Sequence, residues 1–137
     1  MKARFFWAVA LLAPLAARAD LEPGRWEITA TTQMEGMPQP IGPITRMECL
    51  DSRAASDPGS VLGTGAGTCE FSNRREDGGT YTFDVVCTGA FPMRGTGSVR
   101  YDPRALQGSL SLGADVSGKR ISMNSTVIGR RIGDCSP

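Results

Sequence analysis

The sequence contains no histidine, so the commonest general base and the commonest metal-ligating side chain are missing from this 137-residue chain. Its four cysteines include no C-x-x-C pair, which excludes a thioredoxin-like redox motif and the usual cysteine zinc sites. No G-x-S-x-G sequence is present, so a nucleophile elbow is also excluded. Glu70, Asp84 and Asp115 belong to no catalytic pattern and are interpreted as solvated surface carboxylates. We therefore expect a non-enzymatic protein without a cofactor or a bound metal.

Long apolar runs are equally scarce. The longest is Phe5 to Leu15, about eleven residues interrupted by Pro14, whereas a membrane span needs about twenty. A short basic segment precedes this run, and Ala17-Arg18-Ala19 follows it with small residues at the positions that a signal peptidase recognises. We predict a secretory signal at residues 1–19, cleaved after Ala19, with an uncleaved anchor as the alternative. Residues 20–137 then form one exported domain of 118 residues without a transmembrane anchor.

Positive charge is sparse in the exported part. Cleavage leaves 12 basic against 14 acidic residues, a net charge of −2, and Lys119 is the only lysine that remains. Nucleic acids and anionic membrane surfaces attract basic proteins, so neither is an expected partner. The signal indicates a periplasmic protein, with secretion as the alternative.

The four cysteines give the clearest structural information in the sequence. An even number of cysteines in an exported chain indicates disulfides, and Cys49, Cys69, Cys87 and Cys135 allow three pairings.

The hairpin pattern around Asp77-Gly78 favours one of these pairings. Residues 69–73 and 81–87 alternate in polarity on either side of this turn sequence. If Glu76 faces Thr80 across a three-residue loop, Cys69 opposes Cys87 and the apolar residues share one face. This register predicts a Cys69–Cys87 bond and leaves Cys49 to pair with Cys135.

The rest of the chain also alternates in polarity, and no segment has the period of an amphipathic helix. Alternation predicts strands at residues 25–32, 44–50, 96–101, 108–112 and 120–128, with loops at 34–43 and 59–68. Asp51 to Ala55 can cap and start one helical turn, which Pro58-Gly59 would end. We predict an all-β domain: a single antiparallel meander of about seven to eight strands, forming a curved sheet or small open barrel stapled by two disulfides.

Four sequence motifs occur together in a set order: Pro23-Gly24-Arg25-Trp26-Glu27-Ile28, the Met34–Pro38 loop, Glu48-Cys49-Leu50, and Arg130-Arg131-Ile132-Gly133-Asp134-Cys135. This set resembles the bacterial domain-of-unknown-function 3617 family over essentially the whole exported part. The resemblance implies a small exported protein of Gram-negative bacteria with cysteines placed as here. It implies no activity and no catalytic residues.

Three functional hypotheses follow. The first is a non-enzymatic binding domain for a small apolar ligand or an envelope protein, with Trp26, Tyr81, Phe83 and Tyr101 lining a pocket if the barrel is open, or forming plain core if it is filled. The second is a structural or stress-related envelope interaction protein without a pocket, which uses the Met34–Pro43 loop and a sheet edge. The third is an enzyme built on carboxylates. A filled core with an exposed apolar patch would favour a protein partner.

Overall fold

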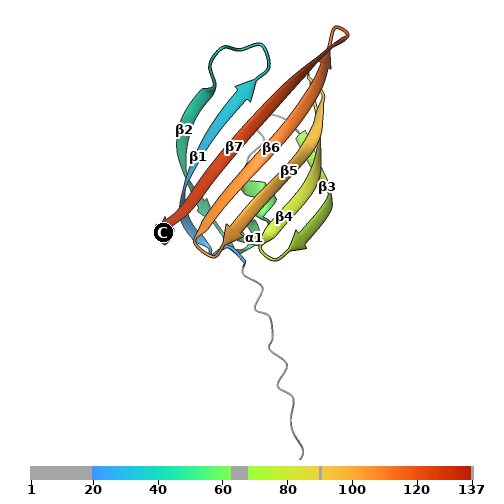
Figure 1. The fold of residues 1–137 in the computed structure, drawn as a ribbon. Helices are drawn as coiled ribbons and strands as arrows, with labels where there is room; N and C mark the ends of the chain where they lie inside the picture. Colours follow the sequence, from blue (N-terminus) through green and yellow to red (C-terminus); the bar gives the residue numbers. More distant parts are fainter. Residues whose placement is uncertain (1–19, 63–67, 90, 137) are drawn as a thin grey trace, which may run out of the picture.

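The computed structural model describes residues 20–62, 68–89 and 91–136. In this part of the chain, seven antiparallel strands form one sheet that is accompanied by very little helix (Figure 1). In chain order the elements are β1 (Gly24–Met34), β2 (Ile41–Leu50), α1 (Ser52–Ala55), the 3₁₀ helix η1 (Pro58–Leu62), β3 (Thr68–Asp77), β4 (Thr80–Thr88), β5 (Met93–Asp102), β6 (Ala105–Val116) and β7 (Lys119–Gly133). The predicted all-β antiparallel fold is confirmed.

The strand order is β2-β1-β7-β6-β5-β4-β3. Every strand therefore pairs with its neighbour in one sheet, but the neighbours β1 and β7 are not consecutive in the sequence. Strands β3 to β7 follow one another, and the β1–β2 hairpin joins them because β1 pairs with β7. The connection from β2 to β3 must then cross from one edge of the sheet to the other. The sheet is open and not curled into a barrel, and β2 and β3 are its two edge strands.

One face of the sheet, called here the inner face, carries the core. In β6 every second residue from Leu106 to Leu112 is buried, whereas the residues between them are exposed polar side chains. The buried cluster draws on most strands and on the crossing segment, and it comprises Leu21, Trp26, Ile28, Leu50, Ala55, Val61, Leu62, Tyr81, Phe83, Val85, Cys87, Val99, Tyr101, Leu106, Leu110, Leu112 and Val127. The opposite face, called the outer face, is left to solvent.

The crossing segment covers the inner face with α1 and η1 (Figure 1). The predicted helical turn is confirmed: the Asp51 side chain accepts a hydrogen bond of 2.8 Å from the Ala54 backbone N–H and caps α1. The predicted role of Pro58-Gly59 is wrong, because α1 ends at Ala55 and Pro58 begins η1 instead. Proline suits the first position of a helix, where no intrahelical partner for an N–H is needed. Residues 63–67 of the predicted loop lie outside the described residues.

The β3–β4 hairpin keeps the predicted register at its base and departs from it near the turn. Cys69 opposes Cys87 and Phe71 opposes Val85, as predicted. At the turn, however, Asp77 and not Glu76 faces Thr80, because only Gly78 and Gly79 form the loop. Both glycines have positive φ, as the twist of a two-residue hairpin turn requires. A bulge between Ser72 and Arg75 takes up the extra residue and restores the predicted register.

Candidate functional site

The four aromatic residues proposed to line a pocket all lie in the core. Trp26, Tyr81, Phe83 and Tyr101 are between 0% and 7% exposed. Tyr81 and Phe83 pack with their ring centroids 5.6 Å apart, and Phe71 meets the Phe83 ring edge-on at 5.1 Å. A pocket lined by these side chains stays a prediction, since a ligand would reach them only if the residues that cover them moved.

The core changes the pKa of the Tyr81 hydroxyl. Burial raises the pKa of its hydroxyl above 10.0, and the nearby Asp57 carboxylate raises the pKa further by repelling the phenolate. Tyr81 therefore stays neutral as a core residue.

The cysteines pair as the hairpin register predicts. The Cα atoms of Cys69 and Cys87 are 4.0 Å apart across β3 and β4, and those of Cys49 and Cys135 are 5.7 Å apart. The first bond closes a local hairpin. The second ties the residues after β7 to the edge strand β2, across the intervening strand β1.

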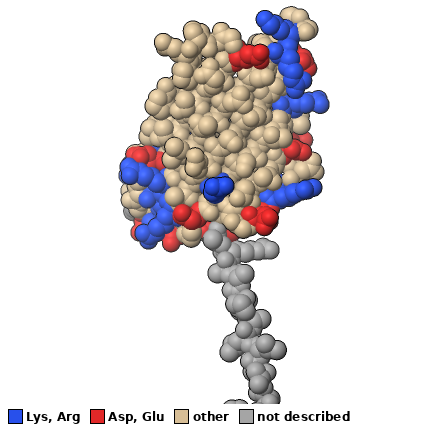
Figure 2. Space-filling model, viewed as in Figure 1, with Lys and Arg blue, Asp and Glu red and all other residues tan. Residues whose placement is uncertain are grey.

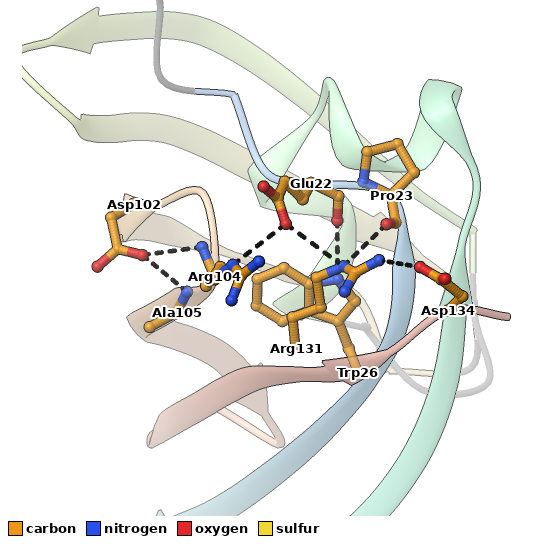
Figure 3. A network of polar contacts seen from close by, with 8 residues as sticks. All are labelled: Glu22, Pro23, Trp26, Asp102, Arg104, Ala105, Arg131 and Asp134. Atoms are coloured by element: carbon orange, nitrogen blue, oxygen red, sulfur yellow. Dashed lines mark hydrogen bonds and ion pairs between the residues drawn. The ribbon is translucent and has the colours of Figure 1, made fainter.

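The two ends of the described chain meet in a polar cluster, the terminal clasp (Figure 3). Leu21 is buried, and the Glu22 carbonyl accepts a hydrogen bond of 3.0 Å from the Trp26 indole. The Arg131 guanidinium donates to the Pro23 carbonyl at 3.0 Å and pairs with Asp134 and Glu22. These partners fix the segment before β1 against the end of β7.

Three of the four motifs that resemble the family converge at this clasp. Arg25 lies between Cys49 and Gly133 in the sheet, and Trp26 lies between Glu48 and Arg131. The fourth motif, Met34–Pro38, forms the hairpin connection at the opposite end of β1. The sequence-distant motifs thus share a structural task, which is to join the chain ends.

The two edge strands differ sharply in how they are protected. β3 carries Glu70, Arg74, Arg75, Glu76 and Asp77 and contains the bulge, and charges and bulges both discourage pairing with another strand. β2 has only one acidic and one basic side chain, Glu48 and Arg46, which pair with each other at 3.2 Å. β2 has its own bulge and a proline at Gly42-Pro43, but from Ile44 to Leu50 its pairing with β1 is regular, so this part of β2 is the less protected edge.

Large apolar side chains are exposed along β2 and its hairpin connection. Ile44 is 60% exposed and projects on the inner-face side opposite Ala30, whereas Met47 is 50% exposed and projects on the other side opposite Glu27. Ile41 at the start of β2 and Met37 in the β1–β2 connection are also exposed. The apolar β2 edge, defined by Met37, Ile41, Ile44 and Met47, matches what an interaction surface needs.

A hollow of about 270 Å³ lies beside this edge. Met47 and the Cys49–Cys135 pair contribute apolar walls, and Arg25, Glu48 and Ser136 complete its lining. A strand added to β2 would direct alternate side chains toward this side of the sheet, where the hollow could receive one of them.

The three carboxylates interpreted as surface residues lie on three different strands, β3, β4 and β6. Glu70 and Asp115 are exposed, and Asp115 lies 3.9 Å from Arg120. Asp84 is half-buried and accepts a hydrogen bond of 2.6 Å from the Asn73 amide, a contact that sequence reasoning did not foresee. Within residues 20–62, 68–89 and 91–136, no cluster of three acidic or cysteine side chains could hold a metal ion, and no helix could cross a membrane.

Sequence reasoning named the Met34–Pro43 loop and a sheet edge as an interaction surface but could not say which edge. The missing signal was partly visible: residues 41–47 contain three large apolar residues around a proline, whereas residues 70–77 contain five charged ones. Only the strand order makes both segments edges.

Comparison with known proteins agrees with the motifs. The model of a protein family described as "Protein of unknown function (DUF3617)" matches residues 21–135. No curated protein and no solved structure matches the chain. Since the family model covers almost the whole chain, the protein belongs to the DUF3617 family.

Proposed function

We propose that this protein is a non-enzymatic binding domain of the periplasm that takes up an extended segment of an envelope protein along β2. The observation that carries the proposal is the asymmetry of the two edges: β3 carries five charged residues, whereas β2 carries two and exposes Ile44 and Met47 in the part that lies beyond its bulge at Gly42-Pro43. Strand addition obtains affinity from main-chain hydrogen bonds and specificity from pockets for alternate side chains. The hollow beside Met47 is suited to such a side chain.

The burial of the core aromatic residues supports a partner protein more than a small apolar ligand. Trp26 and Phe83 are at most 2% exposed, so the aromatic surface that an apolar ligand would seek is already covered. Three of the large apolar side chains left in solvent, Ile41, Ile44 and Met47, lie on β2, where a partner could bury them. Burial of two such side chains would contribute about 1.5–3 kcal/mol each.

Site-specific photo-crosslinking in the organism that encodes the chain tests the proposal. A photoreactive residue replaces Thr45 on β2 in one variant and Ser72 on β3 in a matched variant; both positions are exposed on edge strands. We expect a protein adduct from position 45 and none from position 72. Mass spectrometry of the adduct should locate the cross-link in an extended segment of the partner.

A second pair of variants tests the apolar contact. Ile44→Lys should lower the adduct yield by about tenfold or more, because the lost burial free energy corresponds to at least that factor in affinity. Val86→Lys is the control, since Val86 is 44% exposed but lies on β4, away from β2. Equal yields from positions 45 and 72, or an unchanged yield with Ile44→Lys, would contradict the proposal.

The periplasmic location has its own test. Intact-mass analysis of the protein from the periplasmic fraction should give a chain that begins at Asp20 and contains two disulfides. Leu21 is buried in the terminal clasp, so cleavage even two residues later would remove an anchoring side chain. Recovery of the chain only from the cytoplasm, with residues 1–19 intact, would refute this part of the proposal.

A further inference from the structure

The outer face carries two adjacent rows of small polar side chains that cross the sheet. The strand registers align Thr31, Thr126, Ser109, Ser98, Thr82 and Arg75 in one row, and Gln33, Asn124, Ser111, Thr96, Asp84 and Ser72 in the next. Ten of these twelve residues are uncharged hydroxyl or amide side chains. In the view of Figure 2, which faces these strands, most charged side chains lie near the rim, a blue patch lies low on the face, and the centre above it is uncharged.

This polar face is hollowed where the side chains are smallest. One hollow of about 550 Å³ spans β3 to β6, and a second of about 300 Å³ spans β4 to β7. They share Ser98 and Ser109, so together they form one shallow trough, called here the polar groove. Thr82 and Thr96 lie in the floor at one end, and Thr126 lies at the other.

The β3 bulge provides the head of the polar groove. Asn73 adopts a φ of 50°, a left-handed conformation that asparagine tolerates better than most residues. Its side-chain amide donates a hydrogen bond of 2.6 Å to Asp84 in the lining of the groove. Arg75 follows the bulge, lies opposite Thr82 in the β3–β4 register, and also lines the groove. An amide, a carboxylate and a guanidinium therefore meet at one end.

The chemistry of this lining excludes several kinds of occupant. Protein interfaces rely on aromatic and large apolar anchors, and the side chains lining the polar groove are mainly serine and threonine. An apolar ligand would leave those hydroxyls without partners. An anion would meet Arg75 and Arg100 but also the Asp84 carboxylate. A neutral ligand rich in hydroxyl groups can satisfy every one of these side chains.

We propose that the polar groove binds a neutral saccharide chain. The Asp84 carboxylate accepts hydrogen bonds from sugar hydroxyls, Asn73 and Arg75 donate to them, and the serines and threonines of the floor do both. Neighbouring strands are about 4.8 Å apart, close to the length of one pyranose unit, so successive strands can contact successive sugars. The groove is separate from the β2 edge, and a protein could use both.

Titration of the ¹⁵N-labelled exported chain, with both disulfides formed, tests the proposal by amide chemical shifts. The probes are maltohexaose, chitohexaose, cellohexaose and xylohexaose, with inorganic phosphate as an anion probe. We expect saturable shifts at the amides of Thr82, Ser98 and Ser109 with at least one hexasaccharide. Ser109→Arg fills both hollows and should weaken that binding by about tenfold or more, the equivalent of one or two lost hydrogen bonds.

Ser122→Arg is the matched control, because it places the same side chain on β7 outside the lining of the groove. It should leave the affinity unchanged, as should Ile44→Lys at the β2 edge. The proposal is wrong if none of the four hexasaccharides shifts these amides, or if Ser109→Arg and Ser122→Arg behave alike. Shifts with phosphate alone would identify an anion site and also overturn it.

Discussion

At the scale of single residues, the packing of the sheet depends on a glycine at a position where a larger side chain would not fit. Gly97 on β5 pairs with Phe83 on β4, and the Phe83 ring occupies the space that a Cβ on Gly97 would need. Glycine within a strand ordinarily weakens it, but here it allows a close approach that a larger residue would prevent. The alternation of residues 96–101 predicted a strand, whereas the reason for glycine at position 97 lies in the neighbouring strand.

Gly97→Val should therefore destabilise the protein although valine favours strands. We expect a loss of about 1–3 kcal/mol in the free energy of unfolding, because the added methyl groups must displace a packed aromatic ring. Urea unfolding followed by tryptophan fluorescence measures this. Gly133→Val is the control, since a Cβ at Gly133 would meet no atom within 4 Å and the φ of Gly133 is not positive. Equal losses for the two variants would show that the Phe83 contact is unimportant.

At the scale of elements, the β3–β4 hairpin shows what a local pattern can and cannot predict. Polarity alternation correctly placed Cys69 opposite Cys87, because a slip of one residue would move the apolar side chains to the other face. The same pattern could not reveal the bulge, because residues 72–77 are all polar and contain no alternation that an extra residue could shift. The bulge matters because it turns Asn73 toward Asp84.

The two disulfides belong to this scale, and their loop lengths differ. Cys49 and Cys135 are 86 residues apart, whereas Cys69 and Cys87 are 18 apart. In the chain-entropy model the longer loop contributes about 4–5 kcal/mol and the shorter one about 3 kcal/mol. Replacing Cys49 and Cys135 together by alanine should therefore lower the free energy of unfolding by about 4 kcal/mol.

Urea unfolding measures this loss, and peptide mapping under non-reducing conditions verifies that the other pair is intact. The Cys69→Ala, Cys87→Ala double variant is the comparison and should lose about 3 kcal/mol from the shorter loop. A loss of less than about 1 kcal/mol for the Cys49, Cys135 pair would mean that the terminal clasp alone restrains the chain ends.

At the scale of the whole molecule, contacts between the first and last strands hold the open sheet together. The pairing of β1 with β7 joins the first strand to the last, and the terminal clasp places Leu21 in the common core. The ion pairs of the clasp are partly exposed and each contributes about 1 kcal/mol or less. Apolar burial and the hydrogen bonds to main-chain carbonyls must therefore carry most of its stabilisation.

Leu21→Asp should test this closure. Exchanging a buried leucine for a carboxylate should cost about 2–3 kcal/mol or release the segment before β1 from the core. Amide hydrogen exchange should then rise in the first residues of β1 and in the last residues of β7. Asp20→Asn is the control at the exposed neighbouring position and should change neither stability nor exchange. Unchanged exchange with Leu21→Asp would show that the clasp is dispensable.

The sequence by itself determined the all-β class, most of the strands, the helical turn at Asp51, the cysteine pairing and the family, because alternation, caps and motifs are encoded locally. Tertiary structure alone decided the strand order, since pairing β1 with β7 depends on residues about a hundred positions apart. That order makes β2 and β3 the edges and brings η1 of the crossing segment against Tyr81 and Phe83. It also aligns isolated serines and threonines from separate strands into the polar groove, a neighbourhood that no local pattern contains.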